Sequence, residues 1–249
     1  MILRILLICF SSFLIGGVGL YAASRKEERP VRQTRLTKFI TYFCIVNLVL
    51  LCALAGHRIL SGMTIVVGVL GARELYWVLP RASGGRLSLA LGVGAIYSLI
   101  ATGAVLFAWL SQPSTVVFVY LIVCAFDGFS QVSGQIFGSH SLAPTISPGK
   151  TVEGSAGGLL FAAGMAFLLR PVVGWSAPRS ILVCCFIVVA ALIGDLLASF
   201  VKRRSNVKDF SNLLPGHGGI LDRFDSFLFA ATAYLVVAEA ARRFVMAFL

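Results

Sequence analysis

The residues in this chain most suggestive of chemistry form a polar stripe at the end of a long apolar segment. Asp195 is followed by Ser199, Lys202 and Arg203 at i+4, i+7 and i+8, so in a helix all four side chains share one face. Magnesium prefers one or two carboxylates together with substrate phosphate oxygens. The stripe therefore predicts a site for Mg²⁺ and a phosphorylated substrate. The alternative is a helix end that carries basic membrane anchors.

A glycine-rich segment lies a short distance downstream. Residues 214–219 read Leu-Pro-Gly-His-Gly-Gly, and such a turn permits positive φ and close approach of the backbone to a ligand. A glycine turn that leads into a helix also presents free N–H groups to an anion. Asp222 and Asp225 follow on one helical face. The helix dipole explains one acid at a helix start, but it explains two acids beside Arg223 less well.

Two aspartates occupy positions in or at the ends of apolar segments. An ionised carboxylate in the middle of a membrane helix costs about 2.5 to 3.5 kcal/mol, so Asp127 and Asp195 need a compensating interaction. A hydrated aspartate near the interface, paired with a neighbouring base, is the simple structural explanation. Intramembrane ionisable residues are otherwise candidates for function. Both aspartates therefore count as candidate site residues.

Long apolar segments must position these side chains. A helix needs about 20 mostly apolar residues to cross the hydrocarbon. Continuous rather than alternating apolar runs favour helices over strands. We therefore predict an all-α, polytopic membrane bundle in a single domain, residues 1–249. The eight predicted spans are 2–22, 37–55, 59–79, 89–110, 115–134, 155–175, 180–200 and 226–247.

Composition supports a membrane protein and argues against several other classes. The chain is 58% hydrophobic and only 12% charged, whereas roughly 25% of residues are charged in a typical soluble domain. The six cysteines lie in apolar segments without the spacing of a zinc site, so we interpret them as core residues. The net charge of +11 is better explained by topology and anionic headgroups than by nucleic acid.

The distribution of basic residues predicts the orientation. If the loop at 23–38 is cytoplasmic, fourteen of the 21 Lys and Arg residues fall on that side and six on the other, with Arg73 inside a span. Both termini then face outward. The two long polar loops, 135–154 and 201–225, share the cytoplasmic side. The catalytic part is predicted within 116–249, whereas the spans in 1–115 have no assigned role.

The two polar loops resemble a known family. The segment from Ser199 to Asp225, which contains Ser-Phe-Val-Lys-Arg, Lys-Asp-Phe-Ser and Leu-Pro-Gly-His-Gly-Gly-Ile-Leu-Asp-Arg-Phe-Asp, is similar to the signature of the phosphatidate cytidylyltransferases, also called CDP-diglyceride synthases. Residues 142–154 resemble a second recurring segment of that family, and Asp127 falls where its members carry an aspartate. The sequence departs from the family at Val152, usually aromatic, and at Phe126, usually threonine or serine.

The resemblance implies roles for individual residues. It implies a magnesium-centred site with Asp195 and Asp222 as leading ligands and Asp127 and Asp225 as secondary ones, with a second cation left open. Ser199 could contact metal or phosphate, and His217 is equally an acid–base group or a residue that shapes the loop. The residues expected to contact substrates or serve catalysis are Lys150, Ser199, Lys202, Arg203, Lys208, Asp209, Gly216, His217, Gly218, Gly219 and Arg223.

The resemblance also implies a reaction, partners and a location. A phosphatidate oxygen attacks the α-phosphorus of CTP, giving CDP-diacylglycerol and pyrophosphate. A phosphate monoester has a second pKa of about 6 and is ionised at neutral pH, so the nucleophile needs no general base. The implied partners are CTP, phosphatidate, membrane lipids and a second copy of the chain, and the compact chain fits a bacterial inner membrane.

Other functions remain open at this point. Related enzymes use CTP on other lipids, as CDP-archaeol synthases or as polyprenol or phytol kinases. A transporter would place its acids near the bilayer midplane in discontinuous helices, whereas these acids cluster at span ends beside one loop. A membrane scaffold without catalysis would not need the acid positions, which are present.

Overall fold

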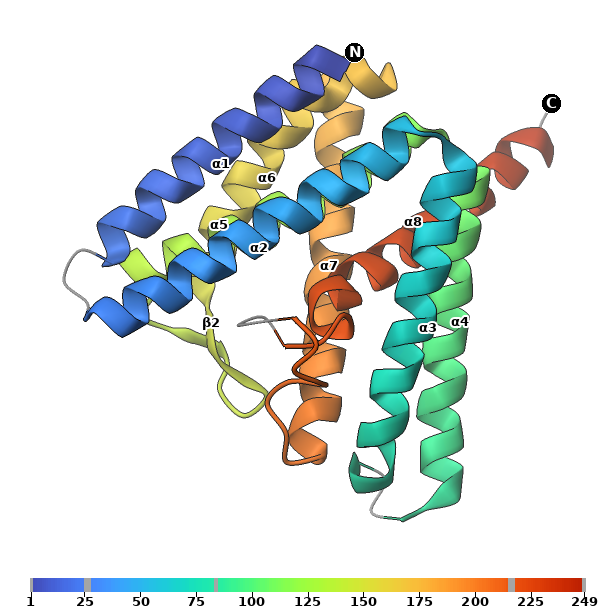
Figure 1. Cartoon of the computed structure of the whole chain (residues 1–249). Coiled ribbons are helices and arrows are strands. Elements are labelled where there is room, and N and C mark those ends of the chain that lie inside the picture. Colours follow the sequence, from blue (N-terminus) through green and yellow to red (C-terminus); the bar gives the residue numbers. More distant parts are fainter. Residues whose placement is uncertain (1, 25–27, 83–84, 215–217, 248–249) are drawn as a thin grey trace.

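The computed structural model describes residues 2–24, 28–82, 85–214 and 218–247, which form a bundle of long helices with one short β-hairpin (Figure 1). This architecture confirms the predicted all-α class. The elements are α1 (Ile2–Ser24), α2 (Arg29–Leu54), α3 (His57–Ala82), α4 (Leu87–Leu110), α5 (Pro113–Phe137), β1 (Ser141–Ala143), β2 (Ser147–Thr151), α6 (Val152–Val173), α7 (Ala177–Arg204) and α8 (Leu221–Ala247).

Seven helices, α2 to α8, are long and apolar enough to cross a membrane. The apolar part of α1 among the described side chains, Leu7–Tyr21, is shorter than the others. Large apolar side chains are exposed along several helices, including Leu99, Leu160 and Leu182 at more than 70%. Such exposure is expected when the surrounding solvent is lipid, because lipid solvates apolar surface.

The helices alternate in direction, which brings the functional loops together. Figure 1 shows the β-hairpin and the loop between α7 and α8 at the same side of the bundle, with the two ends of the chain at the opposite side. Arg203 at the end of α7 donates from Nε to the carbonyl oxygen of Ile146 in the hairpin, at 3.2 Å. The two polar loops therefore lie at the same side of the bundle, and the assignment of that side to the cytoplasm stays a prediction.

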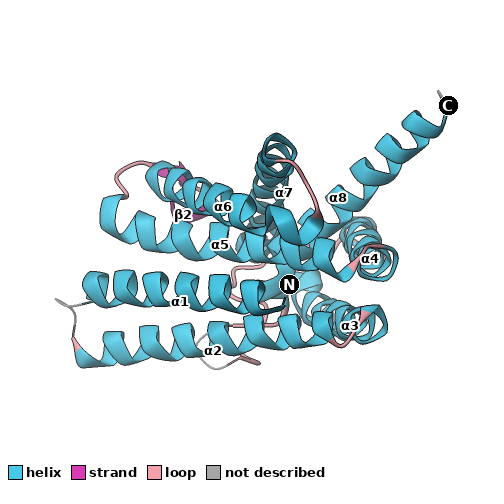
Figure 2. Ribbon diagram, turned by 90° about the horizontal axis from the view of Figure 1, so that it is seen from above, coloured by secondary structure: helices cyan, strands magenta, loops and turns pink. Residues whose placement is uncertain are grey.

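The central helix of the bundle is α5. It packs against α1, α2, α6, α7 and α8, and Figure 2 shows α1 lying between α5 and α2. Close packing of α7 on α8 depends on Gly194, because a Cβ there would lie 2.7 Å from Cβ of Phe229 and 3.0 Å from the carbonyl oxygen of Asp225. This contact holds the neighbouring Asp195 against the start of α8.

Two local features differ from the sequence prediction. The helix α2 begins at Arg29 rather than at 37, and α8 begins at Leu221 rather than at 226, since a helix can continue beyond its apolar part into water. The predicted loop at 135–154 contains the antiparallel pair β1–β2. The hairpin is fixed at its base by Glu153, whose carboxylate accepts hydrogen bonds from the backbone N–H groups of Ser139 (3.1 Å) and His140 (3.2 Å).

Candidate active site

A buried ion pair joins α7 to α8 beside the glycine-rich loop. Nζ of Lys202 lies 2.7 Å from Oδ1 of Asp222, and the side chains are 11% and 1% exposed. Removing one partner of a charge pair buried this deeply strongly destabilises a protein, because the other charge stays buried without compensation. The pair therefore fixes the end of α7 against the first turn of α8.

The second oxygen of Asp222 organises the loop between these helices. Oδ2 accepts hydrogen bonds from the backbone N–H groups of Phe210 and Gly219, both at 2.8 Å. Gly218 adopts φ of 83°, and a Cβ there would lie 2.8 Å from the same oxygen. Three donors thus converge on Asp222, so its main visible role is to hold Lys202 and the loop.

Glu74, in the second half of α3, holds the other side of this loop. It is a buried acid that accepts hydrogen bonds from the N–H groups of Ile220 (2.9 Å) and Leu221 (2.8 Å) and from the hydroxyl of Ser211 (2.7 Å). Its carboxylate caps the start of α8, where a negative charge is favoured by the helix dipole. The sequence analysis missed Glu74, although an acid in an apolar segment was itself a signal.

We expect Glu74→Gln to destabilise the protein by about 1–3 kcal/mol, because an amide offers one acceptor oxygen where three donors now meet. Thermal unfolding in detergent measures this loss. Glu239→Gln is the matched control, since Glu239 forms only a more exposed i,i+3 pair with Arg242. If the two variants unfold at the same temperature, Glu74 does not hold the loop.

Three further carboxylates gather from three helices. Asp127 on α5, Asp195 on α7 and Asp225 on α8 lie near enough for their charges to interact. Asp225 Oδ1 accepts from the N–H of Ser226 at 2.7 Å, and the Ser226 side chain also interacts with Asp127. We call Asp127, Asp195 and Asp225 the acidic triad.

Cations surround the acidic triad on two sides. Lys150, from β2, forms an ion pair with Oδ2 of Asp195, whose Oδ1 accepts a hydrogen bond from Ser199 at 3.3 Å. The charge of Lys202 interacts with Asp195 and Asp225 as well as with Asp222. Arg223 interacts with Asp127. The hairpin, α7 and α8 thus bring acids and bases from distant parts of the sequence to one place.

The acidic triad is chemically suited to magnesium. Within the described ranges no three His, Cys, Asp or Glu side chains are arranged to hold a metal by themselves. Magnesium, however, requires only one or two carboxylates when substrate phosphates supply other oxygens. The carboxylates of the acidic triad can provide such oxygens. Those of Asp195 now contact Lys150 and Ser199, and those of Asp222 contact Lys202 and two backbone N–H groups.

The other predicted site residues occupy the same side of the bundle. Lys208 and Arg223 are exposed, and Asp209 packs beside Gly218. Arg203 donates to backbone oxygens of Ile146 and Val207, so it also connects the hairpin to the loop. The predicted residues Gly216 and His217 lie outside the described residues.

The part of the chain that carries this arrangement matches a known protein family. Residues 87–241 match the sequence profile of the Cytidylyltransferase family. That stretch contains the hairpin, the acidic triad and the glycine-rich loop. The chain belongs to this family. Glu74 and the helices α1 and α2 lie outside the matched residues, so the family profile assigns them nothing.

Individual relatives agree with the family. The chain is 44% identical over 111 residues to a phosphatidate cytidylyltransferase of Bacillus subtilis and 43% identical over 115 residues to one of Haemophilus influenzae. These matches span 44% of this chain in each case, and 41% and 40% of the two relatives, less than half of their length. A phosphatidate cytidylyltransferase of Rickettsia bellii is 32% identical over 200 residues, which span 70% of this chain and 86% of that protein.

Proposed function

We propose that this protein transfers the cytidylyl group of CTP to phosphatidate, giving CDP-diacylglycerol and pyrophosphate. The observation that carries the proposal is the meeting of three carboxylates with Lys150, Lys202 and Arg223 beside a glycine-rich loop at one end of a membrane bundle. The names of the relatives from three bacteria support the same reaction. Two anionic substrates require such a mixture of metal-binding acids and cations.

The reaction forms one phosphorus–oxygen bond and breaks another. A phosphate oxygen of phosphatidate attacks the α-phosphorus of CTP, and the bond from that phosphorus to the β-phosphate oxygen breaks. Pyrophosphate leaves with the electron pair. Because the attacking phosphate is a monoester with a second pKa of about 6, it is already ionised at neutral pH. The protein therefore has to neutralise charge and align the substrates rather than remove a proton.

We propose that the acidic triad holds Mg²⁺, with Asp195 and Asp225 as the principal ligands. When bound, the ion supplies positive charge that screens substrate oxygens from one another and stabilises the leaving pyrophosphate. Asp222, which the resemblance pairs with Asp195 as a leading ligand, keeps Lys202 and the loop between α7 and α8 in place and is the third candidate ligand. Lys150, Lys202, Lys208 and Arg223 contact phosphate oxygens, and Arg203 joins the hairpin to the loop.

We propose a bacterial inner membrane as the location, with the active site on the cytoplasmic side. The excess of Lys and Arg in the loops on the site's side supports this orientation, since cytoplasmic loops carry more positive charge. CTP is then available directly from solution. The family resemblance supports assembly as a homodimer.

A lipid panel tests the proposal. Purified protein in mixed micelles with CTP and Mg²⁺ should release pyrophosphate with phosphatidate, and the rate should fall to background with diacylglycerol or a prenol. An archaeal ether-linked phosphatidate tests the nearest alternative function, that of a CTP-dependent enzyme that acts on another lipid. Faster pyrophosphate release with the ether lipid than with phosphatidate would contradict the proposed substrate.

A further inference from the structure

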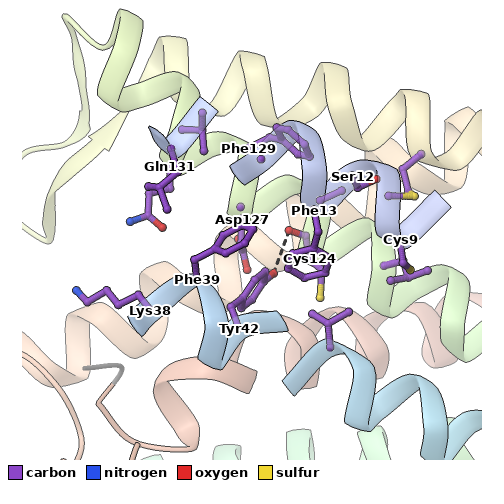
Figure 3. Close-up of a pocket in the computed structure, with 18 of the residues that line it drawn as sticks. Cys9, Ser12, Phe13, Lys38, Phe39, Tyr42, Cys124, Asp127, Phe129 and Gln131 are labelled. Atoms are coloured by element: carbon purple, nitrogen blue, oxygen red, sulfur yellow. Dashed lines mark hydrogen bonds between the residues drawn. The ribbon is translucent and has the colours of Figure 1, made fainter. Parts of the chain in front are cut away.

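A cavity of about 310 Å³ lies between α1, α2 and α5, next to the acidic triad. Figure 3 shows Lys38 at one end, Cys9 at the other and Asp127 between them. Asp127 and Arg223 both line this cavity, so it opens directly onto the residues assigned to cytidylyl transfer. Neither the family profile nor the sequence analysis assigns a role to α1 or α2.

One end of the cavity is polar and cationic. Arg35 and Lys38, one turn apart on α2, line it together with Gln131 and Gln135 of α5. Nη1 of Arg35 donates to Oε1 of Gln135 at 3.3 Å, which directs the guanidinium along the cavity wall. Two cations and two amides at one end fit a phosphate group, because charge-assisted hydrogen bonds to phosphate are strong.

The other end of the cavity is apolar. The cavity wall as a whole is mostly apolar, and its lining residues other than the cationic and amide groups include Cys9, Phe13, Val46, Leu121 and Met165. A nucleotide would find few partners there for its ribose and base. An acyl chain, in contrast, gains free energy from each methylene group that it buries against such a wall.

A groove on the outer face of α1 and α2 adjoins the middle of the cavity, at Phe13 and Phe39. This groove has a volume of about 480 Å³ and shares Phe13 and Phe39 with the cavity. The two rings pack edge to face with centroids 5.7 Å apart, so they form the partition between cavity and groove. Exposed Phe10, Leu14 and Val18 continue the groove towards the lipid.

We propose that this cavity binds the lipid substrate, with its phosphate monoester at Arg35 and Lys38 and an acyl chain along the apolar wall towards the groove. The proposal rests on the proposed function and identifies where the acceptor of the cytidylyl group lies. The phosphate would then be next to Asp127 and Arg223, with CTP on the side of the hairpin and the glycine-rich loop. Because one end of the cavity is cationic and the other is apolar, it matches a lipid phosphate better than a nucleotide or inorganic phosphate.

Steady-state kinetics of the double variant Arg35→Gln/Lys38→Gln test the proposal. We expect KM for phosphatidate, measured as a surface mole fraction, to rise about tenfold or more while KM for CTP stays unchanged, because two charged phosphate contacts are lost. Arg32→Gln is the matched control, since Arg32 is an exposed residue of α2 that does not line the cavity. An unchanged KM for phosphatidate, or a rise in KM for CTP, would overturn the assignment.

A photoreactive phosphatidate provides a test that does not depend on turnover. We expect it to label peptides of α1 and α2 in the wild-type protein, with labelling reduced by unlabelled phosphatidate and by the double variant but not by inorganic phosphate. Labelling confined to helices that do not line the cavity, such as α3 and α4, would overturn the cavity assignment even if the enzyme makes CDP-diacylglycerol. Correct labelling in a protein that makes none would instead contradict the proposed function alone.

Discussion

Asp222→Asn is expected to lower turnover by about 100-fold or more and to destabilise the protein by about 3 kcal/mol. The variant removes the charge that pairs with Lys202 at 2.7 Å, and its amide group has one acceptor oxygen for three donors. Lys202 would then be a buried cation without its closest partner. CDP-diacylglycerol formation and thermal unfolding in detergent measure the two effects.

A double-mutant cycle with Lys202→Gln separates the ion pair from other roles of Asp222. We expect the two substitutions to be non-additive in stability by about 1–3 kcal/mol, since they remove the same contact. Additive losses would mean that the pair does not fix the loop. Near wild-type turnover of Asp222→Asn would contradict any essential role for this residue.

Asp225→Asn, unlike Asp222→Asn, is expected to leave stability unchanged or raise it, and to lower activity by as much. Removing one carboxylate from the acidic triad relieves repulsion from Asp127 and Asp195, so the protein without added metal should unfold at the same or a higher temperature. Turnover should fall by about 100-fold or more, because a ligand of the proposed Mg²⁺ is lost. Magnesium titrations of activity and of the unfolding temperature measure the change.

The matched comparison for this variant is Asp209→Asn, which alters an acid of the loop outside the triad. We expect the Asp209→Asn variant and the wild-type protein to show the same increase in unfolding temperature with Mg²⁺, and Asp225→Asn to show a smaller increase. A full magnesium response in Asp225→Asn would exclude Asp225 as a ligand. A large loss of stability in the same variant would mean that the triad is a structural cluster.

The sequence was sufficient to predict the membrane class, seven of the spans and the shared side of the two polar loops. These features follow from local properties, namely apolar length and the position of charges. The stripe from Asp195 to Lys202 was also predictable, because helical periodicity places these residues on one face. The structure adds the contacts of this stripe. Ser199 donates a hydrogen bond to Asp195, and Lys202 at the other end of the stripe forms the ion pair with Asp222.

Interactions between distant segments could not be predicted in this way. Glu74 contacts Ile220, 146 residues later, and no local pattern indicates that pairing. The ion pair of Lys150 with Asp195 depends on the β-hairpin, which is too short to give an alternating apolar signal. From the sequence alone, Arg35 and Lys38 contributed only to the predicted membrane orientation. The cavity that they line forms only when α1 and α2 pack on α5.

The position of an isotopic label tests the central claim most directly. Purified protein is incubated with phosphatidate, Mg²⁺ and CTP labelled at either the α- or the γ-phosphorus, and the lipid is then extracted. Cytidylyl transfer predicts that the α-label appears in the lipid in equal amount to the pyrophosphate released, and that the γ-label stays in pyrophosphate. Transfer of the γ-label to the lipid, or of neither label, would contradict the claim.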